Sequence, residues 1–120
     1  MNILIIDDSK FIRSHVKKIL ESLNHQVFEA EDGEKGVEAL LKPNQFDLVL
    51  LDWNMPNLDG PGVLQEVEKK IHAPIVMMTT ESAPEKIRMA LELGAKEYIM
   101  KPFTDDVLQE KIDYVIGEAV

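Results

Sequence analysis

Three aspartates directly follow short apolar stretches of the sequence, where a carboxylate can bind a metal ion or attack an electrophile. Asp7 and Asp8 follow the run Ile3–Ile6, and Asp52 follows the run Leu48–Leu51. Two carboxylates about 4–5 Å apart repel each other by roughly 4 kcal/mol at an effective dielectric constant near 20. If the three lie together, a cation must compensate them, and oxygen ligands favour Mg²⁺, with Mn²⁺ as a second candidate, over zinc.

Hydroxyl and ammonium groups follow two later apolar runs. Thr79 and Thr80 come after Ile75–Met78, and Lys101 comes after Tyr98–Met100. A lone acid or lysine in such a place is usually a helix cap or a solvated loop residue. A hard cation, a free carboxylate, a hydroxyl and an ammonium group in one site, however, suit a phosphoryl group.

Five apolar runs, the fifth being Gln26–Ala30, alternate with amphipathic stretches, which predicts alternating strands and helices. Apolar residues recur at helical spacing at Ile12, Val16, Ile19, Leu20 and Leu23, at Val63, Leu64, Val67 and Ile71, and at Val107, Leu108, Ile112, Val115 and Ile116. Shorter helices are expected over residues 33–41 and 84–94. Pro61 and Pro84 suit first helical turns, and Gly94 suits a helix end.

Most of the apolar runs are continuous rather than alternating, as in strands that are buried on both faces. We therefore expect an α/β fold, a doubly wound five-stranded parallel sheet with five helices covering its two sides. The carboxyl ends of the strands in such a sheet lie at one edge, where ligands bind. The acids, the hydroxyls and the lysine would then share one site.

Composition excludes several classes of protein. The 120 residues suit one domain spanning 1–120, and a net charge of −9 without a basic stripe argues against nucleic acid as a partner. The Lys17–Lys18 and Lys69–Lys70 pairs are interpreted as solvated helix positions. No apolar run reaches the 18 residues of a membrane span, and cysteine is absent. We expect a cytoplasmic protein with no membrane partner.

Four motifs together resemble the receiver domains of two-component response regulators, above all the stand-alone chemotaxis regulators of the CheY type. They are IIDDS from residue 5, LLDWNMPNLDG from residue 50, MMTT from residue 77 and YIMKPFT from residue 98. The resemblance covers the whole chain. It implies a flavodoxin-like strand order 2-1-3-4-5 and one receiver domain with no output domain.

The resemblance also implies roles for the residues at the strand ends. Asp52 would accept a phosphoryl group from the phosphohistidine of a histidine kinase or from acetyl phosphate. Thr79 and Lys101 would contact that group, and the peptide bond before Pro102 would be cis. The cation would be bound by the side chains of Asp8 and Asp52 and by the backbone carbonyl of Asn54. Asp7 would act on it through water or as a supporting carboxylate.

In such a regulator, phosphorylation changes a protein-binding face. Thr79 would move towards the phosphoryl group, Tyr98 would turn inward, and the face made by the fourth helix, fifth strand and fifth helix would be remodelled. Asn54 and Glu81 would tune the lifetime of the signal, and the bulk of Thr80 would modify it. The unphosphorylated chain is expected to be a monomer.

Other functions were weighed against this one. An aspartyl-nucleophile phosphatase of the haloacid-dehalogenase type needs a second Asp two residues after the first, where this chain has Asn54. A flavin or nucleotide binder would need a Gly- or Ser/Thr-rich loop in place of the acids of DDSK. We expect no enzyme beyond self-catalysed phosphorylation and dephosphorylation. A chemotaxis regulator of the flagellar motor is favoured, and a phosphorelay protein that passes phosphate to a histidine phosphotransfer protein stays open.

Three smaller interpretations concern residues near these motifs. Trp53 would cover the edge of the site and report on ligand binding by its fluorescence. Asp59–Gly60 would form a loop beside the site rather than a ligand. The methionines Met77, Met78, Met89 and Met100 would fill the core.

Overall fold

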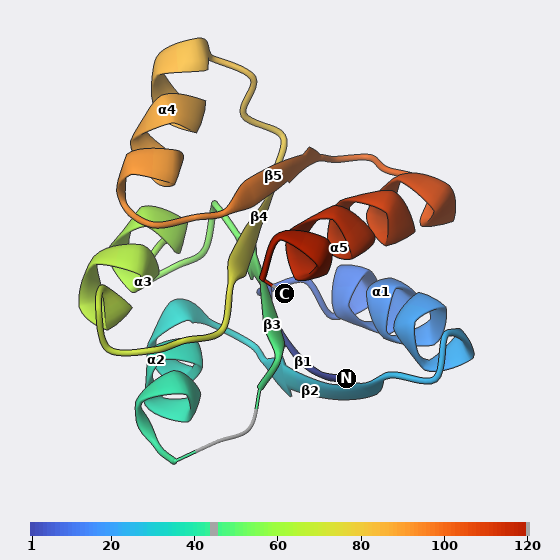
Figure 1. The fold of residues 1–120 in the computed structure, drawn as a ribbon. Helices are drawn as coiled ribbons and strands as arrows, with labels where there is room; N and C mark the ends of the chain where they lie inside the picture. Colours follow the sequence, from blue (N-terminus) through green and yellow to red (C-terminus); the bar gives the residue numbers. More distant parts are fainter. Residues whose placement is uncertain (44–45, 120) are drawn as a thin grey trace.

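The computed structural model describes residues 1–43 and 46–119 and contains one five-stranded parallel sheet in the order β2-β1-β3-β4-β5 (Figure 1). The strands are β1 (Asn2–Ile6), β2 (Gln26–Ala30), β3 (Leu48–Asp52), β4 (Ile75–Thr79) and β5 (Glu97–Met100). The helices are α1 (Lys10–Ser22), α2 (Gly33–Leu41), α3 (Gly60–Val67), α4 (Pro84–Glu92) and α5 (Asp105–Ala119). The predicted doubly wound, flavodoxin-like fold is confirmed.

Side chains of each strand alternate between two cores, because successive residues of a strand point to opposite faces of the sheet. Ile3 and Ile5 of β1 pack with α1 and α5, whereas Leu4 and Ile6 pack on the other side with residues of α2, α3 and α4. The strands β3 and β4 are buried along their full length. Figure 1 shows α1 and α5 on one side of the sheet and α2, α3 and α4 on the other. Both faces are therefore covered, as the continuous apolar runs predicted.

The helix starts follow local sequence signals. The side chain of Ser9 accepts a hydrogen bond from the backbone N–H of Ile12, and that of Asp59 accepts one from Gly62. Pro61 lies in the first turn of α3, as expected. Asp59 is thus the N-cap of α3 and lies beside Asp8, as predicted, whereas Gly60, predicted in the same loop, is the first residue of the helix.

Two predictions about the helices were wrong in detail. The third helix ends at Val67, because Glu68 adopts an extended ψ of 126° and Lys69 a left-handed φ of 62°. Lys69 and Lys70 therefore lie in the connection to β4 rather than on a helix, although Ile71 still packs against the core. Met89 is 39% exposed and does not fill the core, since the buried residue of α4 is its neighbour Ala90.

None of the helices within residues 1–43 and 46–119 has the length and the apolar character needed to cross a bilayer.

Candidate functional site

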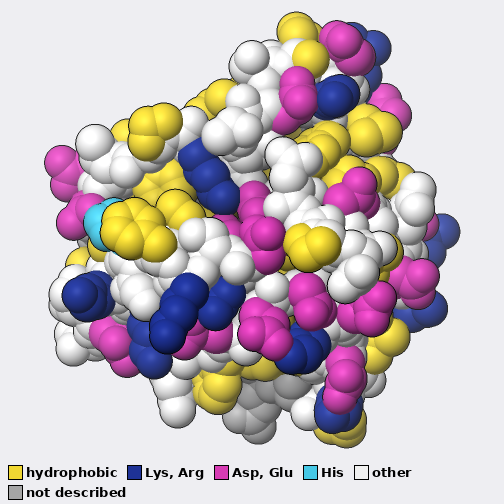
Figure 2. All heavy atoms as spheres, turned by 180° about the vertical axis from the view of Figure 1, so that it is seen from behind, with side chains coloured by type: hydrophobic (Ala, Val, Ile, Leu, Met, Phe, Trp, Pro, Cys, Tyr) yellow, Lys and Arg dark blue, Asp and Glu magenta, His cyan; other side chains and the backbone are white. Residues whose placement is uncertain are grey.

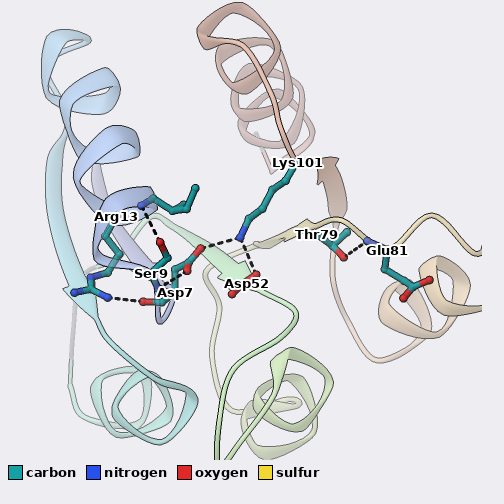
Figure 3. A network of polar contacts seen from close by, with 8 residues as sticks. Asp7, Ser9, Arg13, Asp52, Thr79, Glu81 and Lys101 are labelled. Atoms are coloured by element: carbon teal, nitrogen blue, oxygen red, sulfur yellow. Dashed lines mark hydrogen bonds and ion pairs between the residues drawn. The ribbon is translucent and has the colours of Figure 1, made fainter.

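The three aspartates meet at the carboxyl edge of the sheet, where the order of the strands reverses. Figure 3 shows two of them, Asp7 and Asp52, with Lys101 reaching towards both. Asp7 and Asp8 follow β1, and Asp52 is the last residue of β3. One carboxylate oxygen from each lies within 4.8 Å of the others. Asp7 is fully buried and Asp52 is 7% exposed, whereas Asp8 is exposed to solvent. The site therefore has a buried wall and an open side.

Lys101 joins the two buried carboxylates. Its Nζ lies 2.8 Å from Oδ1 of Asp52 and 3.0 Å from Oδ2 of Asp7. The backbone N–H of Lys101 donates to the carbonyl of Thr79, and the Lys101–Pro102 peptide is cis, as expected. The ammonium group of Lys101, which follows β5, thus bridges Asp7 after β1 and Asp52 at the end of β3.

The electrostatics of this group of charges favour a further cation. Burial and the negative charges of Asp7 and Asp8 together raise the pKa of Asp52 to about 6, against the opposing hydrogen bond and positive charge of Lys101. Burial disfavours the charge of Lys101, but its hydrogen bonds to Asp52 and Asp7 outweigh that effect and raise its pKa. Three carboxylates face one ammonium group, so the site carries an excess of negative charge.

The donor set fits a hard divalent cation. The three clustered side chains, Asp7, Asp8 and Asp52, each offer a carboxylate oxygen, which Mg²⁺ and similar ions prefer. A hollow of about 390 Å³ opens beside Asp8 and is also lined by Asn54, Met55, Pro56 and Asp59. Asn54, the remaining residue predicted to bind the cation, therefore borders the open side of the site.

Thr79 ends β4 and is 2% exposed. Its Oγ1 accepts a hydrogen bond of 2.8 Å from the backbone N–H of Glu81, so the hydroxyl is held on the β4–α4 loop. The carboxylate of Glu81 contacts the ammonium group of Lys86 at 3.3 Å. Thr80 is exposed. Two of the residues predicted to tune the lifetime of a signal, Thr80 and Glu81, thus lie in the connection between β4 and α4.

Tyr98 is half-buried on β5 and contacts side chains of its own strand and of α5. Nζ of Lys111 lies 5.4 Å from the centre of the Tyr98 ring and 3.5 Å from Oε1 of Glu97. The same oxygen of Glu97 accepts a hydrogen bond from the backbone N–H of Tyr98. The predicted switch residue is therefore linked to both β5 and α5.

Gly60 allows the start of α3 to pack closely against the end of β3. Its N–H donates to the carbonyl of Trp53 at 2.8 Å, and a Cβ at this position would lie 2.7 Å from the backbone oxygen of Asp52. Trp53 itself is only 7% exposed, and its side chain packs in the core on the α2–α4 side. It lies beneath the site rather than across its edge.

Sequence analysis missed one residue at the site, Arg13. Its Nη1 donates to the backbone carbonyl of Asp7 at 2.7 Å, and its Nε donates to Glu29 on β2 at 3.1 Å. The one available signal was its position four residues after Ser9, one helical turn into α1. Neither contact is visible in a periodic pattern, because both depend on tertiary structure.

Known proteins are similar to this chain over nearly its whole length. The sequence pattern of the family described as response regulator receiver domain matches residues 3–113. A chemotaxis protein CheY homolog of Campylobacter jejuni is 40% identical, over 98% of this chain and 93% of that protein. Chemotaxis protein CheY-3 of Vibrio cholerae is also 40% identical, over 96% and 91% of the two chains.

Two solved structures extend the comparison to the fold. Chemotaxis protein CheY4 of Vibrio cholerae superposes with a TM-score of 0.86 at 32% identity, over 95% of this chain and 97% of that one. The receiver domain of a sensor histidine kinase of Pseudomonas aeruginosa gives a TM-score of 0.87 at 26% identity, over 97% of each chain. That second structure has a magnesium ion coordinated in its active site cleft.

Proposed function

This chain belongs to the response regulator receiver domain family. We propose that it is a cytoplasmic regulator that accepts a phosphoryl group on Asp52 and signals in chemotaxis. One observation carries the proposal. The ammonium group of Lys101 bridges two buried carboxylates, Asp52 and Asp7, beside the third carboxylate of Asp8. The names of the relatives from Campylobacter and Vibrio support the chemotaxis assignment.

Asp52 is the proposed nucleophile. With a pKa of about 6 its carboxylate is ionised at neutral pH, and it can attack the phosphorus of a phosphohistidine or of acetyl phosphate. The new O–P bond forms as the bond to the imidazole or to acetate breaks, which leaves an acyl phosphate on Asp52. Lys101 lies close enough to Asp52 for its ammonium group to contact the oxygens of a phosphoryl group bound there.

We assign the cation site to Asp7, Asp8, Asp52 and the backbone carbonyl of Asn54. Mg²⁺ bound there would neutralise phosphoryl oxygens as charge develops on them. Mn²⁺, with similar oxygen preference, is expected to substitute. Asp7 is held by Lys101 at Oδ2 and by the backbone N–H of Ser9 at Oδ1, so we assign it a supporting role among the ligands.

The proposed switch starts at Thr79. A phosphoryl group adds about −1.5 to −2 of charge and three acceptor oxygens. The Thr79 hydroxyl, whose oxygen accepts from the backbone N–H of Glu81, can donate its own proton to one of them and would be drawn towards the phosphoryl group. Movement of Thr79 would leave space for Tyr98 to turn inward and would change the face made by α4, β5 and α5. Exposed apolar side chains on these helices, including Met89 and Tyr114, suit a protein partner.

The proposed partners are a histidine kinase or phosphotransfer protein as donor and the flagellar motor switch as the output partner. Asn54 and Glu81, with the bulk of Thr80, are assigned to the lifetime of the acyl phosphate. We propose that the only reactions that this chain catalyses are its own phosphorylation and dephosphorylation. We expect a monomer before phosphorylation.

Binding of partners to an activated form tests the output. Beryllofluoride with Mg²⁺ serves as a stable substitute for the phosphoryl group, and the loaded protein is offered purified flagellar switch protein and purified histidine phosphotransfer protein. We expect beryllofluoride-dependent binding of the switch protein, with Asp52→Asn as the control that does not respond. Beryllofluoride-dependent binding of the phosphotransfer protein alone would replace the chemotaxis assignment by a phosphorelay. Failure of the wild type to take up beryllofluoride would contradict the proposal as a whole.

A further inference from the structure

We propose that Arg13 is a positioning residue that fixes the backbone of Asp7 and thereby sets the affinity of the site for a divalent cation. This inference rests on the magnesium site of the preceding subsection and adds to it a residue that binds neither the cation nor the phosphoryl group. The carrying observation is that the Arg13 side chain connects three elements, α1, the end of β1 and β2.

The contacts of Arg13 are directional. One nitrogen, Nη1, donates to the carbonyl of Asp7 at 2.7 Å, while another, Nε, donates to the carboxylate of Glu29 at 3.1 Å. Glu29 also lies 3.6 Å from the ammonium group of Lys17. The Arg13 side chain is only 12% exposed. A planar guanidinium group can make both contacts at once because its donors point in fixed, diverging directions.

Arg13 completes a set of contacts that immobilises Asp7 (Figure 3). The N–H of Asp7 donates to the carbonyl of Ala30 on β2 at 3.2 Å, and its two carboxylate oxygens accept from Ser9 and Lys101. Arg13 is the donor to its remaining polar atom, the backbone carbonyl. Asp7 is fully buried, so loss of this donor leaves a carbonyl without solvent to replace it. The backbone that carries Asp7 and then Asp8 would shift in response.

The charge of Arg13 and its support of Asp7 have opposite effects on the affinity of the site for a cation. As a positive charge near the carboxylates, Arg13 repels a cation, and its removal alone would tighten cation binding. As a support for Asp7, it favours cation binding, and its removal would weaken it. Loss of partners that orient metal ligands typically lowers metal affinity about 10–100-fold. The sign of the change in affinity therefore distinguishes the two roles.

Two substitutions separate these effects. Arg13→Gln removes both the charge and the bridge, whereas Arg13→Lys keeps the charge but has a single nitrogen and cannot reach Asp7 and Glu29 together in the same way. Lys18→Gln removes the same charge from an exposed position of α1 and serves as the matched control. Magnesium affinity is measured by calorimetry at neutral pH, with the circular dichroism of each variant recorded to establish that it is folded.

We expect both Arg13 variants to bind Mg²⁺ about 10–100-fold more weakly than the wild type, and Lys18→Gln to stay within about 2-fold. Phosphorylation by acetyl phosphate should recover in the Arg13 variants at saturating Mg²⁺, because only the affinity of the site is altered. Unchanged or tighter Mg²⁺ binding by both Arg13 variants, with normal binding by the wild type, overturns this inference alone. Absence of Mg²⁺ binding by the wild type overturns the proposed site and this inference with it.

A measurement on the wild type covers the case in which the variants do not fold. The Nη groups of a bridging arginine rotate slowly and give separate nitrogen-detected NMR signals, while those of a solvated arginine average. We expect separate signals for Arg13. Averaged signals for the Arg13 guanidinium overturn the inference without any substitution.

Discussion

Replacement of Asp52 by asparagine should stabilise the metal-free protein at neutral pH, although it removes the proposed phosphoacceptor. Burial first, and then the nearby Asp7 and Asp8, raise the pKa of Asp52 from 3.8 to about 6 in the folded state. The unfolded chain has no such environment, so its carboxyl group keeps a pKa near 3.8. Ionisation of Asp52 is therefore less favourable in the folded state than in the unfolded state.

The size and sign of the effect follow from linkage between protonation and folding. A folded-state pKa raised by about two units lowers the free energy of unfolding by about 3 kcal/mol once the group is ionised in both states, since one unit is about 1.4 kcal/mol. The contribution is absent below the unfolded pKa, where both states are protonated. It grows as the pH rises from the unfolded to the folded pKa, reaching about 1 kcal/mol near pH 4.5 and about 3 kcal/mol near pH 7.5. Asp52 thus lowers the stability of the metal-free protein as the pH rises.

Urea unfolding followed by circular dichroism, with a chelator present, measures this difference. We expect Asp52→Asn to exceed the wild type in free energy of unfolding by about 3 kcal/mol near pH 7.5 and by about 1 kcal/mol near pH 4.5. Added Mg²⁺ should stabilise the wild type and narrow the gap, because a ligand that binds only the folded state stabilises it. Glu66→Gln, at an exposed position of α3, is the control and should change little. A variant no more stable than the wild type at either pH would refute the reasoning.

Three other outcomes are expected at the same site. Lys101→Met should destabilise the metal-free protein by about 3–5 kcal/mol in thermal or urea unfolding, because it leaves two buried carboxylates without their ammonium group; stability equal to that of the wild type would contradict this. Gly60→Ala should lower the free energy of unfolding by about 1–3 kcal/mol, because a Cβ there would lie 2.7 Å from the backbone oxygen of Asp52. Gly117→Ala, with open space around it, should be neutral or stabilising by up to about 1 kcal/mol. Equal effects of the two substitutions would count against the close packing at Gly60. The fluorescence of Trp53, which directly follows Asp52, should change when Mg²⁺ binds to the wild type but not to Asp52→Asn, and a signal that is identical in the two would disprove the link.

The fold was predictable because the sheet is buried on both faces. Continuous apolar runs such as Leu48–Leu51 distinguish its strands from the amphipathic helices, and residues at the strand ends follow from the direction of parallel strands. The end of α3 was not predictable, because Ile71 continues the apolar face of the helix while the chain leaves that helix at Glu68. Met89 was misplaced for a similar reason, since apolar character alone does not tell a core position from an exposed one.

The residues of the candidate site were likewise predictable only in part. Asp7, Asp8, Asp52 and Lys101 were predicted to share one place, and the structure brings them together. The role of Arg13 could not be predicted, because its contacts join α1 to a backbone carbonyl and to a residue of β2.

Intact-protein mass spectrometry with peptide mapping is the most direct test of the central claim, that this acidic pocket accepts a phosphoryl group on Asp52. The protein is incubated with acetyl phosphate with and without Mg²⁺, and Asp52→Asn is treated in parallel. We expect the mass of one phosphoryl group to appear on the wild type only when Mg²⁺ is present, to map to Asp52, and to be missing from the variant. No added mass on the wild type, or the same added mass on Asp52→Asn, would contradict the claim.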